Sequence, residues 1–336
     1  HLFIIKINMN NLDIYTSTGA KYHRAFQVFD SLRHGIGRPQ SLQVALTNKC
    51  NLSCIFCSVA ERELKQQWDY DELMQAIDSF ISVGIKTIEF SGGGEPTLFP
   101  RFSELIRECN GRGLKLGLIT NSIKLKELSL SRLPVLSYFD WIRISMVALD
   151  YQETIELPDK FPDNVTIGMS YVVGQKEYQG KRTHWHDDYT QLMKVKEYAI
   201  KYNAEFVRIV PDCHSDSNEM LKLHDYYGIL CNQLGNPFFF QYKMPYQAKI
   251  CYMDSVKPWL DVDGFIYHCN SIPLHQDAGF KFHPKYRLCH WSEIESYYQN
   301  RGSQSLKVDS CNYCVFTKNN DVIKDLLTPM EHEEFV

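Results

Sequence analysis

The chain has 336 residues, of which 44% are hydrophobic and 23% are charged, and its formal net charge is -4. This length and apolar content allow a large core, with one large domain and one smaller one. No apolar run approaches the roughly 20 residues that cross a bilayer, the N-terminal residues lack the pattern of a secretory signal, and the charge balance excludes a general nucleic-acid binder. We therefore expect a globular, cytoplasmic protein without a membrane partner.

Residues 1–40 are predicted to form an N-terminal extension, and beyond them short β-type runs alternate with longer amphipathic stretches. This alternation is typical of βα units around a parallel sheet. Helices are predicted over residues 69–83 and 189–202, each with a capping residue at its start. The α/β pattern favours a partial, TIM-like (β/α)6 barrel over residues 41–236. The six predicted strands are Leu42–Leu46, Thr87–Phe90, Leu114–Ile119, Trp141–Ser145, Val165–Val172 and Phe206–Val210.

Three cysteines, Cys50, Cys54 and Cys57, follow the first predicted strand directly. In the reducing cytosol such a cluster indicates metal ligation, not disulfides. A structural zinc or an electron-transfer cluster normally takes four protein ligands, whereas three thiolates leave one iron open to a small molecule. A zinc site completed by a distant His is the alternative.

A glycine-rich turn, Gly92-Gly93-Gly94-Glu95-Pro96, ends the second predicted strand. Glycines let the backbone approach a ligand closely, and a carboxylate can hold an ammonium group. Taken alone, such a turn is also compatible with a plain loop.

The cysteine spacing, with an aromatic residue before the last Cys, resembles the signature of the radical S-adenosylmethionine (SAM) superfamily, and the glycine-rich turn stands where that family requires it. The resemblance implies a [4Fe-4S] cluster on the three cysteines and SAM at its open iron. It also implies that Gly93, Gly94 and Glu95 bind the amino group of the methionine moiety.

Two later strands resemble the third and fourth strands of the family. In Leu118–Asn121, the resemblance implies that Asn121 contacts the cofactor. In Arg143-Ile144-Ser145, it implies that Ser145 contacts the ribose, and an ordinary strand serine is the alternative. The family pattern usually continues to an acidic residue two positions later, where this chain has Val147. The implied reaction uses an external one-electron reductant of the flavodoxin or ferredoxin type, cleaves SAM to a 5′-deoxyadenosyl radical and abstracts hydrogen from the substrate.

Residues 237–318 are predicted to form a small α+β domain with a turn at Asp263-Gly264, followed by a tail over residues 319–336. Four thiols in this domain can close around one metal, either zinc or an iron–sulfur cluster. Their spacing resembles the auxiliary-cluster domain of the superfamily in its shortened form, called a Twitch domain. That resemblance implies a second [4Fe-4S] cluster, held by Cys251, Cys269, Cys311 and Cys314.

The remaining cysteines invite separate interpretations. Cys213 follows the sixth predicted strand at the mouth of the barrel, where a thiol can return a hydrogen atom to a substrate radical; an inert loop cysteine is the alternative. Cys289 is a second candidate, near the auxiliary cluster, whereas Cys109 and Cys231 are assigned to core packing. The segment His184–Asp188 is either a substrate-facing loop or a solvated loop with a helix cap.

The leading hypothesis is a radical SAM oxidoreductase or isomerase that dehydrogenates or rearranges a small polar substrate such as a sugar, an aminocyclitol or a nucleotide derivative. The first alternative is a maturase or epimerase that modifies a short peptide. Residues 1–40 are fewer than the leader-binding domain with which many such maturases begin, so the sequence favours the small molecule. The second alternative is a non-catalytic zinc-binding module.

Overall fold

The computed structural model describes residues 21–22, 26–54, 56–60, 62–131, 134–174, 177–178, 181–182, 188–243, 246–274, 286–308, 311 and 314–328. Within these residues, no helix is both long enough and apolar enough to cross a membrane. The α-helices are α3 (Phe26–Arg33), α4 (Tyr70–Ser82), α5 (Phe102–Gly111), α6 (Leu125–Ser129), α7 (Asp188–Lys201), α8 (Ser217–Leu234), α9 (Ile294–Asn300) and α10 (Thr317–Leu327).

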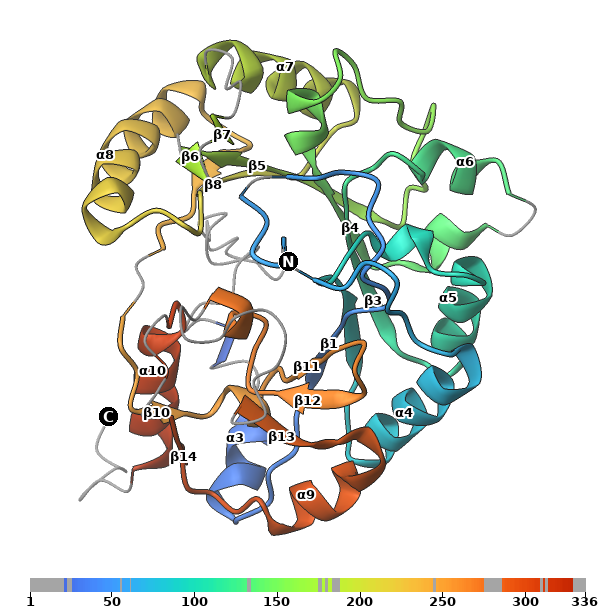
Figure 1. The fold of residues 1–336 in the computed structure, drawn as a ribbon, viewed down its shortest axis with the longest axis vertical. Coiled ribbons are helices and arrows are strands. Elements are labelled where there is room, and N and C mark those ends of the chain that lie inside the picture. The colour runs from blue at the N-terminus through green and yellow to red at the C-terminus, as the bar shows by residue number, and fades with distance from the viewer. Residues whose placement is uncertain are drawn as a thin grey trace, which may run out of the picture.

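Parallel strands form most of one curved sheet, which Figure 1 shows from one end. The six strands predicted from the sequence are confirmed. In spatial order they are β1 (Ser41–Val44), β2 (Thr87–Phe90), β3 (Lys115–Thr120), β4 (Trp141–Ser145), β5 (Thr166–Val173) and β8 (Phe206–Pro211).

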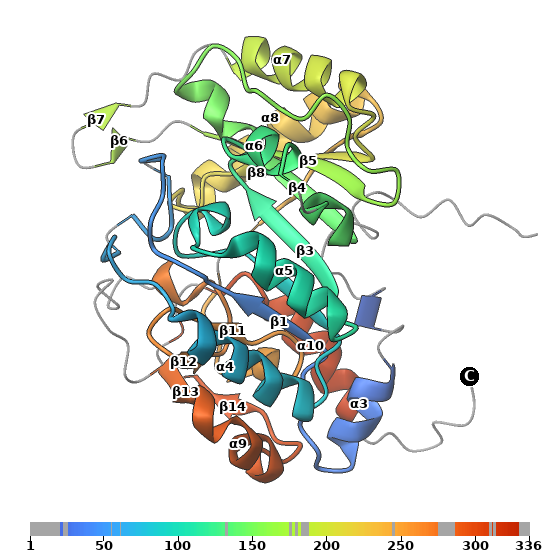
Figure 2. The same ribbon diagram turned by 90° about the vertical axis from the view of Figure 1, so that its right-hand side faces the viewer.

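Helices α4, α5, α6, α7 and α8 lie on the outer side of this sheet (Figures 1 and 2). Both predicted helices are confirmed, as α4 and α7. The Asp69 side chain caps α4 by accepting hydrogen bonds from the backbone N–H groups of Asp71 and Glu72, at 3.0 and 3.1 Å. Alternate strand residues, such as Ile88 and Ile142, belong to the same buried core as α4. The other face of the sheet is thus turned away from the helices.

A seventh parallel strand, β9 (Phe238–Phe240), pairs with β8 and follows α8, so a further helix–strand unit continues the predicted pattern. The other edge of the sheet is extended by β11 (Trp259–Leu260), which runs parallel to β1. A tight turn at Asp263-Gly264 then leads into the antiparallel strands β12 (Phe265–Tyr267) and β13 (Arg287–His290). The domain boundary after residue 236 stays a prediction, but strands from both sides of it share this sheet.

Smaller elements complete the described part. The two-stranded pairs are β6 (Glu177–Tyr178) with β7 (Lys181–Arg182), and β10 (Ile250–Cys251) with β14 (Leu306–Lys307). Helix α10 includes residues 319–327 of the predicted tail and packs on α3 of the predicted N-terminal extension through Phe29, Leu32 and Ile323. The 3-10 helices are η1 (Pro96–Leu98), η2 (Val135–Tyr138), η3 (Met146–Asp150), η4 (Met253–Ser255), η5 (Ile272–Leu274) and η7 (Trp291–Glu293).

Candidate functional site

The loop that follows β1 carries Cys50, Cys54 and Cys57, and neighbouring side chains donate hydrogen bonds to two of its sulfurs. Arg62 Nη1 donates to Cys57 Sγ at 3.6 Å, and Asn121 Nδ2 donates to Cys50 Sγ at 3.8 Å. Arg62 also donates to the backbone oxygen of Asn48 at 2.7 Å, which fixes the guanidinium beside the loop. N–H donors of this kind favour sulfur in its thiolate form.

The electrostatic setting of the three thiols shows that they are close neighbours. Burial raises the pKa of Cys50 and raises that of Cys54 to about 12, and the charge of Cys57 raises both pKa values further. A buried group of mutually repelling thiolates needs a positively charged partner. Three sulfur ligands with N–H donors at their edge fit an iron–sulfur cluster, whose irons are normally held by thiolates.

The glycine-rich loop after β2 is pressed against the start of the cysteine loop. Gly92 and Gly93 have backbone φ values of +96° and +62°, which residues other than glycine rarely adopt. The Gly94 N–H donates to the Thr47 backbone oxygen at 2.6 Å, and the Glu95 N–H donates to the Lys49 backbone oxygen at 2.8 Å. A Cβ atom at Gly94 would lie 1.9 Å from the Lys49 oxygen, so only glycine fits there.

We therefore expect Gly94→Ala to separate the two loops. The added methyl group would overlap backbone atoms, which cannot rotate away, and overpacking of this kind costs about 1–3 kcal/mol or more. The iron content after anaerobic reconstitution and the melting temperature should both fall. Gly111→Ala at the end of α5 is the matched control, because a Cβ there meets nothing within 4 Å. Equal iron content and stability in the two variants would contradict this close contact.

Glu95 joins the glycine-rich loop to the end of β3. Its side chain is buried, with 3% relative exposure, and accepts hydrogen bonds from Thr97 Oγ1 and Thr120 Oγ1 at 2.6 Å and from the Asn121 N–H at 2.7 Å. The Thr97 N–H also donates to it, at 3.2 Å. Burial raises the pKa of Glu95, and these hydrogen bonds oppose the rise. The predicted contact between Glu95 and an ammonium group stays a prediction, but the carboxylate clearly positions the loop.

Asn121 and Ser145 stand at the ends of β3 and β4. Asn121 Nδ2 also donates to Asn51 Oδ1 at 2.6 Å, so Asn121 links β3 to the cysteine loop. Ser145 pairs in register with Ser170 of β5 and is partly exposed. The structure thus brings Asn121 together with Cys50 and Glu95, while the cofactor contacts of Asn121 and Ser145 stay predictions.

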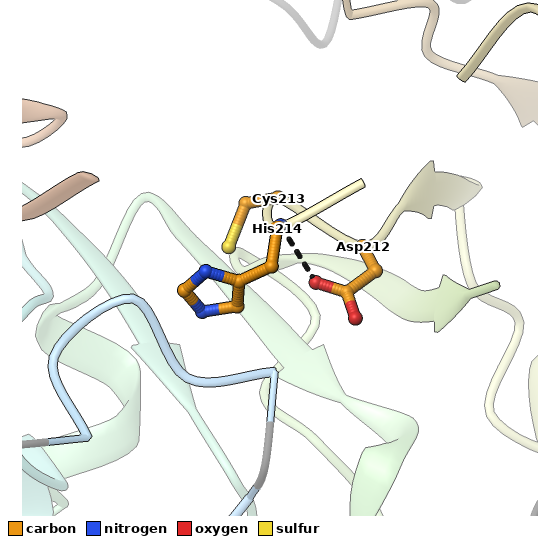
Figure 3. A group of neighbouring side chains, drawn as sticks. All are labelled: Asp212, Cys213 and His214. Carbon is orange, nitrogen blue, oxygen red and sulfur yellow. Dashed lines mark hydrogen bonds between the residues drawn. The ribbon is translucent and has the colours of Figure 1, made fainter. Parts of the chain in front are cut away.

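Cys213 lies directly after β8, beside Asp212 and His214 (Figure 3). One ligand atom from each of these three residues lies within 4.8 Å of the others, and Asp212 Oδ1 accepts a hydrogen bond from the His214 backbone N–H at 2.9 Å. Cys213 Sγ is 3.4 Å from the backbone oxygen of Phe56, to which it donates, and so lies next to the cysteine loop. Burial raises the pKa of Cys213 to about 12, which keeps it a neutral thiol that retains its hydrogen.

The four predicted auxiliary cysteines also come together. They line one cavity and form a buried cluster with Met253 and Val308, although Cys251 and Cys314 are far apart in the sequence. Burial raises the pKa of Cys269 to about 12, whereas a hydrogen bond from the Cys311 side chain lowers that of Cys314 to about 6. Four convergent sulfurs fit either zinc or an iron–sulfur cluster.

Other candidates lie elsewhere. Cys289, in β13, pairs with Ile266 and is not among the residues that line the auxiliary cavity. Cys109 and Cys231 are buried in the main core, as predicted. Residues 183–187, which include most of the predicted His184–Asp188 loop, lie outside the described residues. Arg62 was missed, because nothing in its sequence context marks a contact with a cysteine.

Comparisons with known proteins agree with this geometry. Residues 44–155 match the family described as "Radical SAM superfamily". One relative is a tungsten-containing aldehyde ferredoxin oxidoreductase cofactor-modifying protein of Pyrococcus furiosus, 33% identical over 122 residues that cover 34% of this chain and 32% of the relative. Another is an S-adenosylmethionine-dependent nucleotide dehydratase of Lacinutrix mariniflava, 27% identical over 130 residues that cover 37% of this chain and 27% of the relative. The chain thus matches about a third or less of the length of these two relatives.

Among solved structures, Streptococcus suis SuiB bound to precursor peptide SuiA superposes with a TM-score of 0.51 at 15% identity, covering 84% of this chain and 73% of that one. This likeness concerns the fold. The match of residues 44–155 covers the cysteine loop, the glycine-rich loop and strands β2 to β4. Residues 44–155 thus contain a domain that matches the radical SAM superfamily, and the SuiB structure shares the fold of the larger part of the chain.

Proposed function

We propose that the protein is an enzyme that cleaves SAM reductively and abstracts hydrogen from a small polar substrate, which it dehydrogenates or rearranges. The contact between the cysteine loop and the glycine-rich loop carries the proposal, because it brings three thiols and a backbone cradle to one end of the barrel. When bound there, a reduced [4Fe-4S] cluster supplies the electron that breaks the sulfonium bond of SAM.

The chain's own residues hold and orient these groups. Cys50, Cys54 and Cys57 are the proposed cluster ligands, with Arg62 and Asn121 as N–H donors to their sulfurs. Gly93, Gly94 and Glu95 are proposed to receive the amino group of SAM, and Ser145 its ribose. The neutral thiol of Cys213 is positioned beside the cysteine loop, which supports a role as hydrogen-atom donor to the substrate.

Cys251, Cys269, Cys311 and Cys314 are proposed to hold a second [4Fe-4S] cluster. Four thiolates saturate such a cluster, so its expected role is electron transfer during substrate oxidation, with a flavodoxin or ferredoxin as the external reductant. The nucleotide dehydratase among the relatives supports a nucleotide derivative as one substrate to test. The SuiB structure, solved with a precursor peptide, makes a short peptide the alternative.

The test is anaerobic reconstitution followed by incubation with SAM and a one-electron reductant. About eight irons per chain and formation of 5′-deoxyadenosine would support the proposal, whereas a zinc-loaded protein without SAM cleavage would overturn it. Candidate substrates deuterated at their C–H bonds should transfer deuterium into 5′-deoxyadenosine. Transfer from a peptide alone would replace the small-molecule substrate with a peptide.

The role of Glu95 can be tested with Glu95→Gln. This change keeps the shape of the side chain but removes the charge that would pair with the ammonium of SAM, so the Kd for SAM should rise at least about tenfold, equivalent to about 1.4 kcal/mol. Equilibrium binding on the iron-loaded protein measures this. Glu127→Gln, which changes an exposed glutamate of α6, is the control. An unchanged Kd in Glu95→Gln would leave Glu95 with its positioning role only.

A further inference from the structure

The face of the sheet turned away from the helices carries charged side chains in the middle of two strands. In β4, the fully buried Ile142 and Ile144 flank Arg143. In β8, the fully buried Val207 and Ile209 flank Arg208. Since side chains alternate along a strand, both arginines point to the inside of the curved sheet. Arginine is uncommon in such a position unless it binds something.

Sheet register places the two arginines on either side of β5. Arg143 is paired with Gly168, and Arg208 is paired with Ser170, which is itself paired with Ser145. Below Arg208 on the same face, the ring of Phe206 covers Gly168, because a Cβ on that glycine would lie 2.0 Å from the ring. The ring therefore closes the inside of the sheet toward the strand beginnings, and Arg208 lies one step closer to the strand ends, where the candidate site is.

Positive charge is in excess at this place. The Glu89 carboxylate of β2 interacts with both Arg143 and Arg208. It also forms an ion pair with Lys257, whose Nζ lies 2.8 Å from Glu89 Oε2, so one carboxylate is shared by three cations. Among the described residues, the buried Nε atoms of Arg143 and Arg208 have no hydrogen-bond partner. A further cation lies near, because the Gln241 N–H donates to the Ile209 backbone oxygen at 2.8 Å and holds the chain two residues before Lys243 against β8. Burial and then the charge of Arg208 lower the pKa of Lys243 to about 8.

Several buried cations that share one carboxylate, Glu89, are unfavourable in a low-dielectric place, and a further anion relieves them. The guanidinium group binds oxyanions with two parallel N–H bonds, and two arginines with a lysine match the several oxygens of a phosphoryl group better than the two of a carboxylate. Arg143 and Arg208 are both partly exposed, so a ligand inside the sheet can reach them.

We propose that Arg143, Arg208 and Lys243 form a binding site for a phosphoryl group of the substrate, on the inner face of the barrel. The assignment of this anion to the substrate rests on the proposed function. The substrate is then a phosphorylated small molecule, either a nucleotide or a sugar phosphate. Its phosphoryl group is held at the arginines, and its reacting carbon lies toward the strand ends and the cysteine loop.

Inorganic pyrophosphate is the first probe, titrated into the reconstituted protein without reductant, with the Kd measured by calorimetry. Arg208→Met and Arg143→Met should each raise the Kd at least tenfold, while Arg107→Met, an exposed arginine of α5, should leave it unchanged. Arg208→Lys, which keeps the charge, should lose less affinity than Arg208→Met. Arg208→Met removes one of several like charges that share Glu89, so this variant should keep its melting temperature in the absence of pyrophosphate.

A nucleoside triphosphate and a hexose phosphate are tested next, to distinguish the two sources of the phosphoryl group. The source is the ligand that binds more tightly and whose affinity falls in Arg208→Met. The proposal is overturned if pyrophosphate does not bind, or if Arg107→Met raises the Kd for pyrophosphate as much as Arg208→Met does. It is also overturned if Arg208→Met weakens SAM binding and leaves pyrophosphate binding unchanged. Because no SAM cleavage is measured here, a protein that binds pyrophosphate through Arg208 but never forms 5′-deoxyadenosine would retain this site and lose the proposed reaction.

Discussion

Cys54→Ala should abolish the reductive cleavage of SAM. The three sulfurs of the first loop are the whole set of protein ligands at the proposed cluster, so the loss of one leaves two, which is too few to hold four irons with one of them open to SAM. Burial of Cys54 and its interaction with Cys50 and Cys57 place it inside this set. The expected result is a loss of 5′-deoxyadenosine formation to the background level, together with about four irons per chain.

The matched control is Cys289→Ala, which removes a half-buried thiol of β13 outside both cysteine sets. Its SAM cleavage should equal that of the unchanged protein. Chromatographic quantification of 5′-deoxyadenosine, after reconstitution and iron analysis of both variants, gives the comparison. Full 5′-deoxyadenosine formation by Cys54→Ala would end the radical SAM interpretation of this loop.

The parallel sheet could be predicted because each strand carries its own signal. β2 and β4 are short β-type runs with buried residues at alternate positions, between longer helical stretches, and the structure gives them the predicted ends. Asp69 marks the start of α4 through a local hydrogen bond, which needs no tertiary information. These features depend on neighbours in the sequence, so a single sequence contains them.

The edges of the sheet could not be predicted in the same way. β9 consists of three phenylalanines that also suit a loop packed on a core, and its strand conformation depends on pairing with β8. β11 has only two residues and joins β1 across more than 200 residues of sequence. Pairings over such separations depend on the assembled fold.

In the candidate site, too, features local in the sequence could be predicted and contacts between distant segments could not. Spacing alone grouped Cys50, Cys54 and Cys57, whereas the contact of Gly94 with Lys49 needed the coordinates, because two loops from different strands form it. The two inward arginines also have a signal in the sequence. Arg143 and Arg208 interrupt otherwise apolar strands at single positions, and a lone charge in a buried strand indicates a functional residue.

The double variant Cys311→Ala/Cys314→Ala tests whether the proposed second metal centre takes part in the reaction. These two cysteines line one cavity with Cys251 and Cys269, and a centre with four sulfur ligands has no iron open to SAM. The variant should therefore still form 5′-deoxyadenosine through the first centre, but should make little final product from its true substrate.

Because metal binding stabilises small regions that depend on it, circular dichroism and iron content of the variant are measured first. The matched control is Cys231→Ala/Cys289→Ala, which removes two thiols outside both cysteine sets. It should keep about eight irons and the full yield of product. A folded Cys311→Ala/Cys314→Ala protein with about four irons that converts substrate at the native rate would limit the second centre to a structural role. The case for an oxidative reaction would then lose its main support, because the second centre is the proposed acceptor of the electron from the substrate radical.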